Sequence, residues 1–177
     1  MPIEKSAKII DFMEKQDYIP RSFVDKVRDF YKEKEDNTKT IRIFPTLSDI
    51  MLDNLYKICE NDVEYFVPLW HHELIYDNHG QDLCVEIHPQ LEENIMIDEN
   101  NHVHIVKTFT IQELWNNEKI ELNIGNKKIS FPRENLKLTK QQTISIPNNG
   151  IALINNNNVY DVSKRGSIFI HIALTLN

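Results

Sequence analysis

An internal repeat constrains the fold of this chain more than any other feature of its sequence. Thr46–Met51 (TLSDIM) aligns without a gap with Thr110–Trp115 (TIQELW), and the match continues downstream at the same offset. The apolar alternations of Leu83–Ile87 and Ile168–Ile172 also match once an insertion is allowed in the second copy. A fixed-offset repeat of this kind indicates two tandem copies of one structural module.

Each copy contains the sequence signature of a short, capped helix. Thr46 and Thr110 are suitable N-cap residues, and Asp49 and Glu113 follow them at the third position. In a capping box these side chains satisfy the first backbone N–H groups of a helix. We therefore expect a helix of one to two turns between strands in each copy.

From residue 40 onward, apolar and polar residues alternate with the period of two that is typical of half-buried strands. Short turn signals such as Asn149-Gly150 favour antiparallel hairpins over the long crossovers of parallel sheets. The expected fold class is mainly β, with two tandem β-sandwich subdomains that each carry one short helix. The predicted strands are Thr40–Phe44, Asn54–Glu60, Asp62–Leu69, His72–Tyr76, Asp82–His88, His102–Phe109, Lys119–Ile124, Lys127–Phe131, Gln142–Ile146 and Ser167–Leu176.

The N-terminal segment follows a different period. Its apolar residues recur at three- and four-residue steps, and Pro20 suits the first turn of a second helix. Two short amphipathic helices are predicted, and their apolar stripes must be buried either on the first sandwich or against a second copy. The expected domains are a helical N-terminal segment or linker at 1–38, a first β-sandwich subdomain at 39–92 and a second at 93–177.

Composition excludes several classes of partner. With 27 acidic and 20 basic residues the net charge is -7, which disfavours binding to nucleic acid or to an anionic membrane surface. Cys59 and Cys84 are too few for a disulfide framework and form no C-x-x-C pair, which indicates a reducing compartment and no structural zinc. The apolar stretch Ile168–Leu176 is too short to span a bilayer. We expect an intracellular protein that is not secreted.

The order of these motifs resembles the C-terminal client-binding region of the DnaJ family of co-chaperones (J-domain proteins), in its zinc-free form. IRIFPTLSDI and DLCVEI, within residues 41–88, resemble the first subdomain of that region. VHIVKTFTIQELWNNEKIEL, IPNNGIAL and GSIFIHIAL, within residues 95–176, resemble the second. The short form and A/T-biased composition look most like the divergent J-proteins of large DNA viruses, which implies a cytoplasmic location, in the host if viral.

The chain also departs from the family pattern. It has no His-Pro-Asp tripeptide, since His88-Pro89 is followed by Gln90, so no J-domain is expected within it. Delivery of clients to a DnaK-type chaperone would then go through a J-domain absent from this chain. The helix that dimerises many family members after the last strand is also absent, which leaves the homodimeric state open.

The resemblance implies a non-enzymatic protein that holds unfolded polypeptide segments by strand addition beside an apolar groove. A structural or assembly protein with one dedicated partner is the alternative. Family members that bind the acidic tail of the DnaK-type partner carry basic residues near the groove. Here only Lys57 is close, because Tyr56 and Cys59 occupy positions where basic residues would be expected. Carried over residue by residue, the groove is formed by Ile41, Ile43, Ile58 and Val85, with Tyr56 and Lys57 at its rim, although alternation alone also allows these to be ordinary core residues.

No catalytic group, cofactor or metal is expected. His71 and His72 point to opposite faces of a strand, whereas His102 and His104 share a face that His171 or Asp98 could join. Solvated strand histidines are the commoner outcome of such a pattern. Cys59 and Cys84 lie within predicted strands, where thiols are usually inert.

The sequence also predicts the surroundings of the two tryptophans and of one asparagine run. Trp115, at the end of the second short helix, is expected to pack against its own sheet. Trp70 is expected at the surface or at a rim. The run Asn155–Asn158 is expected to be a solvated loop tip.

Overall fold

The computed structural model describes residues 3–16, 18–36, 38–78 and 80–175, without the side chains of 3–7 and 33–36. Three residues that bound predicted strands or domains lie outside the described ranges: Met1, Leu176 and Asn177. Two compact units are present, Met1–Ile41 with Ile75–Val85 and Arg42–Leu74 with Glu86–Asn177. These units do not test the predicted domain boundaries after residues 38 and 92, which stay a prediction.

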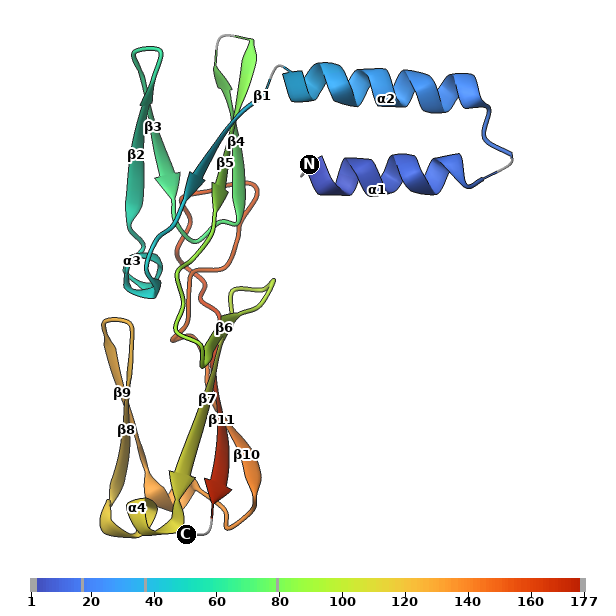
Figure 1. The fold of residues 1–177 in the computed structure, drawn as a ribbon. Coiled ribbons are helices and arrows are strands. Elements are labelled where there is room, and N and C mark those ends of the chain that lie inside the picture. The colour runs from blue at the N-terminus through green and yellow to red at the C-terminus, as the bar shows by residue number, and fades with distance from the viewer. Residues whose placement is uncertain (1–2, 17, 37, 79, 176–177) are drawn as a thin grey trace. The chain divides into compact units, whose positions relative to one another are not determined.

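The chain is mainly β, as predicted (Figure 1). Each of the ten predicted strands overlaps an observed one, whereas the three-residue strand β6 was not predicted. The helices are α1 (Ile3–Glu14), α2 (Arg21–Asp36), α3 (Leu47–Met51), α4 (Ile111–Asn116) and the 3-10 turn η1 (Arg133–Asn135). The strands are β1 (Thr38–Ile43), β2 (Leu55–Glu60), β3 (Val63–Pro68), β4 (Glu73–Asn78), β5 (Gln81–Ile87), β6 (Ile95–Ile97), β7 (Val103–Thr110), β8 (Lys119–Ile124), β9 (Lys127–Pro132), β10 (Gln141–Ile146) and β11 (Ile168–Thr175).

The strands form four sheets, with the orders β1-β5-β4, β10-β11-β7-β6, β2-β3 and β8-β9. β2-β3 and β8-β9 are antiparallel hairpins, whereas Asn149-Gly150, expected as a hairpin turn, lies in the long connection between β10 and β11. The expectation of antiparallel strands throughout is wrong for β7 and β11, which pair in parallel from Val103↔Ile168 onward. Parallel neighbours need a long crossover, and here α4, β8, β9 and β10 all lie between the two strands in the chain.

The two predicted capping boxes are confirmed. Thr46 Oγ1 accepts from Asp49 N at 3.2 Å, and Asp49 Oδ2 accepts from Thr46 N at 3.0 Å. Thr110 and Glu113 repeat both bonds, at 3.1 and 2.8 Å. Hydrogen bonds from Thr46 lower the pKa of the Asp49 carboxyl, and those from Thr110 lower the pKa of Glu113. Each short helix is therefore fixed at its N-terminus by its own first turn.

Asn101 joins three segments that are distant in sequence. Its side chain is buried, and Nδ2 donates to Trp70 O at 2.8 Å and to Ala152 O at 2.6 Å. Its Oδ1 accepts from His72 Nε2 at 3.2 Å. Gly166 completes the contact, because a Cβ there would lie 2.4 Å from Asn101 O. Asn101 has a φ of 59°, a left-handed conformation that asparagine tolerates better than most residues.

The solvated loop tip expected at Asn155–Asn158 is present, with Asn155 half-buried, and the insertion of the second copy also makes contacts beyond this tip. Asn156, Asn157 and Asn158 are exposed as predicted. The two residues that follow make contacts across the fold: His71 Nε2 donates to Val159 O at 2.9 Å, and Tyr160 Oη donates to Phe66 O at 3.0 Å. An ion pair between Arg165 and Asp53 adds a third contact. The insertion therefore covers part of the first copy, a role that its composition does not reveal.

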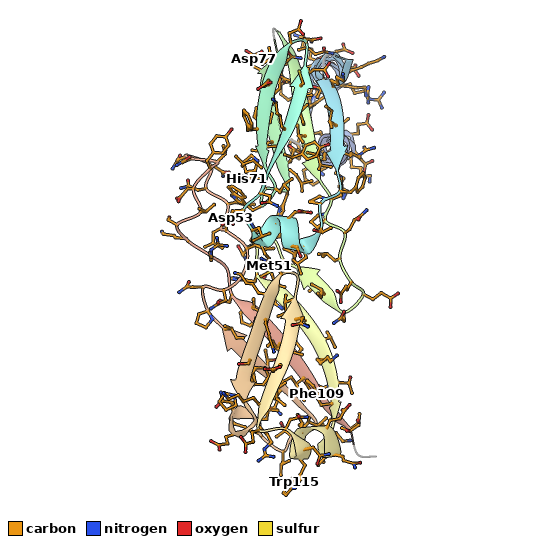
Figure 2. All side chains as sticks on the ribbon, turned by 90° about the vertical axis from the view of Figure 1, so that its left-hand side faces the viewer. Met51, Asp53, His71, Asp77, Phe109 and Trp115 are labelled. Atoms are coloured by element: carbon orange, nitrogen blue, oxygen red, sulfur yellow. The ribbon has the colours of Figure 1, made fainter. Side chains whose placement is uncertain are left out.

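The two tryptophans are placed opposite to expectation. Trp70 is 3% exposed, and Trp115 is 76% exposed. In the six-residue helix α4 the side that contacts the sheet includes the buried Leu114, so the next residue points away. Met51, which aligns with Trp115, is buried in α3, next to the tip of the β8-β9 hairpin (Figure 2). The turn of this hairpin packs against α3, since a Cβ on Gly125 would lie 3.2 Å from Ser48 Oγ.

Two helices precede β1, as predicted, and they lie side by side in antiparallel orientation (Figure 1). Val24 is buried, and Arg28 of α2 forms an ion pair with Glu14 of α1. Within the described ranges, none of the helices has the length and apolar content needed to cross a bilayer.

Asn101→Ala should lower the free energy of unfolding by about 3 kcal/mol, because it leaves two buried carbonyls without donors and places alanine at a positive φ. Urea unfolding of both proteins measures the difference. Asn100→Ala is the matched control, since that neighbouring side chain is exposed and its stability change should stay near zero. A loss below about 1 kcal/mol in Asn101→Ala would contradict the role assigned to this amide.

Stability should fall as the pH drops below about 6.5, in part through His71. Burial lowers the pKa of the His71 imidazole below its usual value, outweighing the hydrogen bond to Val159. The unfolded chain therefore takes up this proton first, and stability is lost between the unfolded and folded pKa values, by at most about 1.4 kcal/mol per pH unit. Urea unfolding at several pH values should show a shallower acid loss for His71→Gln than for the wild type.

Candidate functional site

The candidate site is an open groove of about 570 Å³ between the end of β1 and the start of β2. All of its lining residues belong to the second compact unit. Asp49 of α3 and Leu69, the residue that follows β3, also line the groove. The full lining is Arg42, Ile43, Phe44, Pro45, Asp49, Asn54, Leu55, Tyr56 and Leu69.

The charged residues of the lining are held by partners within the protein. Arg42 Nε donates to Glu86 Oε2 at 2.8 Å, and His88 Nε2 lies 3.2 Å from the same oxygen. The hydrogen bond from Arg42 lowers the pKa of Glu86, so this carboxylate stays ionised at neutral pH. Asp49 caps α3 and accepts from Asn54 Nδ2 at 3.3 Å. The polar rim is thus fixed before any ligand arrives.

The apolar residues of the groove divide into floor and wall. Ile43 and Leu69 are buried and form the floor. Phe44 is 57% exposed, and Leu55 and Tyr56 are each 48% exposed. The Phe44 ring also stacks on His88, with 5.8 Å between ring centroids. Large apolar side chains exposed together around a concavity are typical of a surface that binds apolar groups of a partner.

The groove lies beside an edge of the β2-β3 hairpin. Among the described residues, β3 is the strand that pairs with β2. Leu69 N donates to Asn54 O at 3.3 Å, which makes Asn54 and Leu69 a hydrogen-bonded pair. In an antiparallel ladder such pairs alternate, so the N–H and C=O groups of Leu55, Lys57 and Cys59 point away from β3. β2 therefore presents an outward-facing row of backbone donors and acceptors.

The structure brings two of the six predicted groove residues, Ile43 and Tyr56, into this lining. Lys57 is exposed on β2 and pairs with Glu64 at 2.5 Å. Four of the six are outside the lining: besides Lys57, these are Ile58 and Val85, which are buried, and Ile41, which is half-buried in β1 and belongs to the first unit with Val85. That all six share one groove stays a prediction.

Sequence reasoning missed Phe44 and Leu55. A signal existed for Leu55, because consecutive apolar residues at Leu55-Tyr56 place one on each face of the strand, and one face of a two-stranded ribbon must stay exposed. For Phe44 the strand pattern indicated only a strand end, and its exposure depends on how the chain turns toward α3.

The repeat places a second hollow, of about 710 Å³, at the equivalent position of the second copy. Glu113 corresponds to Asp49, Lys119 to Leu55 and Ile120 to Tyr56. Lys119 is charged and Ile120 is buried, so the exposed apolar wall of the first groove is missing here. The second hollow is lined by Phe109, Glu113, Asn116, Asn117, Glu118, Lys119, Ile120 and Glu121.

The histidines considered as metal ligands, His102, His104 and His171, are engaged in hydrogen bonds. His104 Nδ1 lies 3.1 Å from His171 Nε2, and His104 Nε2 lies 3.2 Å from Asp98 Oδ2. His102 and His104 both contact the Phe169 ring, in keeping with the shared face expected from the sequence, and His102 Nδ1 accepts from Ser167 N at 2.8 Å. Among the residues that the structure describes, no three His, Cys, Asp or Glu side chains are grouped to hold a metal ion.

The groove lining contains no thiol, hydroxyl nucleophile or imidazole except the phenol of Tyr56. Cys59 is exposed on β2 outside the lining, and Cys84 is buried. The groove can offer a ligand apolar contact, and the neighbouring edge of β2 can offer backbone hydrogen bonds. No model of a known protein family matches the sequence, and no curated protein matches it.

A hydrophobic dye such as ANS should bind at the groove, because the dye reports clustered apolar surface. Leu55→Ser with Tyr56→Ser should remove most of the fluorescence enhancement, since both side chains line the groove and are about half exposed. Leu138→Ser is the control, since this leucine is 85% exposed but outside the groove. Equal losses in the two variants would contradict a binding groove at this position.

Proposed function

We propose that this chain is the client-binding region of a co-chaperone, which holds extended segments of unfolded polypeptides by strand addition to β2. The observation that carries the proposal is the outward-facing backbone of Leu55, Lys57 and Cys59 beside an exposed apolar groove. An extended segment would continue the β2-β3 ladder with its main chain and insert alternate side chains into the groove. Such recognition accepts many sequences, because the hydrogen bonds are made by the backbone.

The resemblance of the sequence to the DnaJ C-terminal region supports the same proposal. It would make the two copies tandem β-sandwich subdomains of the DnaJ type, with the client site in the first. Delivery to a DnaK-type chaperone would be the next step, through a J-domain that this chain does not contain. We propose a cytoplasmic location, without nucleic-acid or membrane partners, in keeping with the net charge of -7.

The expected affinity is modest. Phe44, Leu55 and Tyr56 expose on the order of 250 Å² of side-chain surface at the groove. At about 25 cal/mol per Å², covering that area contributes about 6 kcal/mol before the cost of ordering the client. Binding in the micromolar range or weaker follows, which suits a protein that must release its client.

Lys57→Pro should abolish the suppression of client aggregation. Proline removes the N–H that points away from β3, so it blocks an added strand without removing a β2-β3 hydrogen bond. The measurement is light scattering of a chemically denatured protein diluted with and without the chain. Glu121→Pro is the matched control, because Glu121 occupies the equivalent position of β8 and likewise pairs with a lysine, Lys128.

Two further variants complete the experiment. Lys57→Ala removes the ion pair to Glu64 but keeps the N–H, so it should suppress aggregation as well as the wild type. Phe44→Ser with Tyr56→Ser should weaken binding by about ten-fold or more through lost apolar contact. Unaltered suppression by folded Lys57→Pro would contradict strand addition. No suppression by the wild type would contradict client holding and favour one dedicated partner.

A further inference from the structure

The helices α1 and α2 each have an apolar arc that is wider than the contact between them. In α2, Val24 is 5% exposed and Arg28 forms the ion pair to α1, so these two residues mark the side toward α1. Phe23 precedes Val24 by about 100° around the helix and is 53% exposed. In α1, Glu14 faces α2; Ile9, 39% exposed, precedes Ile10 by about 100°, and Phe12, 61% exposed, lies about 60° beyond Ile9 on the side away from α2.

The exposed parts of the two arcs share one face of the hairpin. Ile9 precedes Ile10, and Phe23 precedes Val24, by the same rotation about helices of the same hand. The helices lie side by side and antiparallel (Figure 1). The same rotation, measured in each helix from the side that faces the other, therefore turns both exposed arcs to one side of the hairpin. Phe30, at 56% exposure, falls within the arc of Phe23. The hairpin is therefore a single layer with one apolar face.

From this face we infer that the protein forms a homodimer, in which the α1-α2 hairpins of two copies pack face to face as a four-helix bundle. A layer of two helices, one of only 12 residues, gains little stability by itself, and domains are built from at least two packed layers. A second hairpin supplies an identical apolar face, and a two-fold axis makes the contact self-complementary.

The exposed area fits a dimer. At about 200 Å² per large side chain, Ile9, Phe12, Phe23 and Phe30 expose on the order of 400 Å² per copy. A standard interface buries about 800 Å² per partner, of which slightly more than half is apolar. The four side chains therefore supply nearly all of the apolar area that one copy needs.

The charge of the hairpin also fits a second copy. Residues 1–38 contain nine acidic and eight basic residues, whereas residues 39–177 contain eighteen acidic and twelve basic ones. Two identical acidic surfaces repel each other, so self-association is least opposed through the nearly neutral helical segment. Its exposed charges alternate in sign, as the pairs Lys15–Asp11 and Arg28–Asp25 show, which allows complementary contacts at the rim of a bundle.

Sedimentation of the full chain over a wide concentration range tests the inference. The wild type should show a reversible monomer–dimer equilibrium, and Phe12→Lys with Phe23→Lys should weaken it by about ten-fold or more. Trp115→Lys, which removes a 76% exposed aromatic residue outside the hairpin, should dimerise like the wild type. Circular dichroism checks that the double variant keeps its helices.

Amide hydrogen exchange of the wild type gives an independent readout that needs no variant. Exchange in α1 and α2 should slow as the concentration rises through the dimer range, because the bundle protects both helices. A wild type that stays monomeric up to near-millimolar concentration overturns the inference. Dimerisation of the folded double variant at wild-type strength, or helix exchange independent of concentration, overturns it as well.

Discussion

The buried amide of Asn101 is the interaction on which the second compact unit depends. It donates to the main chain at Trp70 and at Ala152, so one side chain fixes the connection after β3 to the insertion before β11. Gly166 has to be glycine because the Asn101 carbonyl occupies the place of a side chain. With this contact in place, the insertion lies close enough for Val159 and Tyr160 to bind the first copy. These contacts stabilise the position of the β2-β3 hairpin and of the candidate groove beside it.

One repeated backbone gives two surfaces of different character. Both copies have a capped helix, an antiparallel hairpin and a hollow between them, in the same register. In the first, Leu55 and Tyr56 expose apolar surface; in the second, Lys119 is charged and Ile120 is buried. Even the cross-strand ion pair is inverted, from Lys57–Glu64 to Glu121–Lys128. Side chains at a few positions therefore separate a proposed client site from its structural counterpart.

Local patterns predicted local structure well in this chain. The capping boxes and the β8-β9 hairpin follow from residues within one turn or one hairpin, where neighbouring side chains and backbone decide the outcome. Trp70 and Trp115 were misplaced because their burial depends on segments that are far away in sequence. For the candidate site, Ile43 was predicted as a groove residue and Tyr56 as a rim residue, and both line the observed groove. Phe44 and Leu55 were found only through their exposure in the folded chain.

The sequence by itself determined the mainly β class, the two helices before β1, and the position of both short helices, because periodicity and capping act over a few residues. Tertiary structure alone decided that β7 and β11 run in parallel and that the insertion covers the first copy. It also decided that β2 keeps an outward-facing edge beside an apolar groove. These features depend on hydrogen bonds between residues tens of positions apart, which no local pattern records.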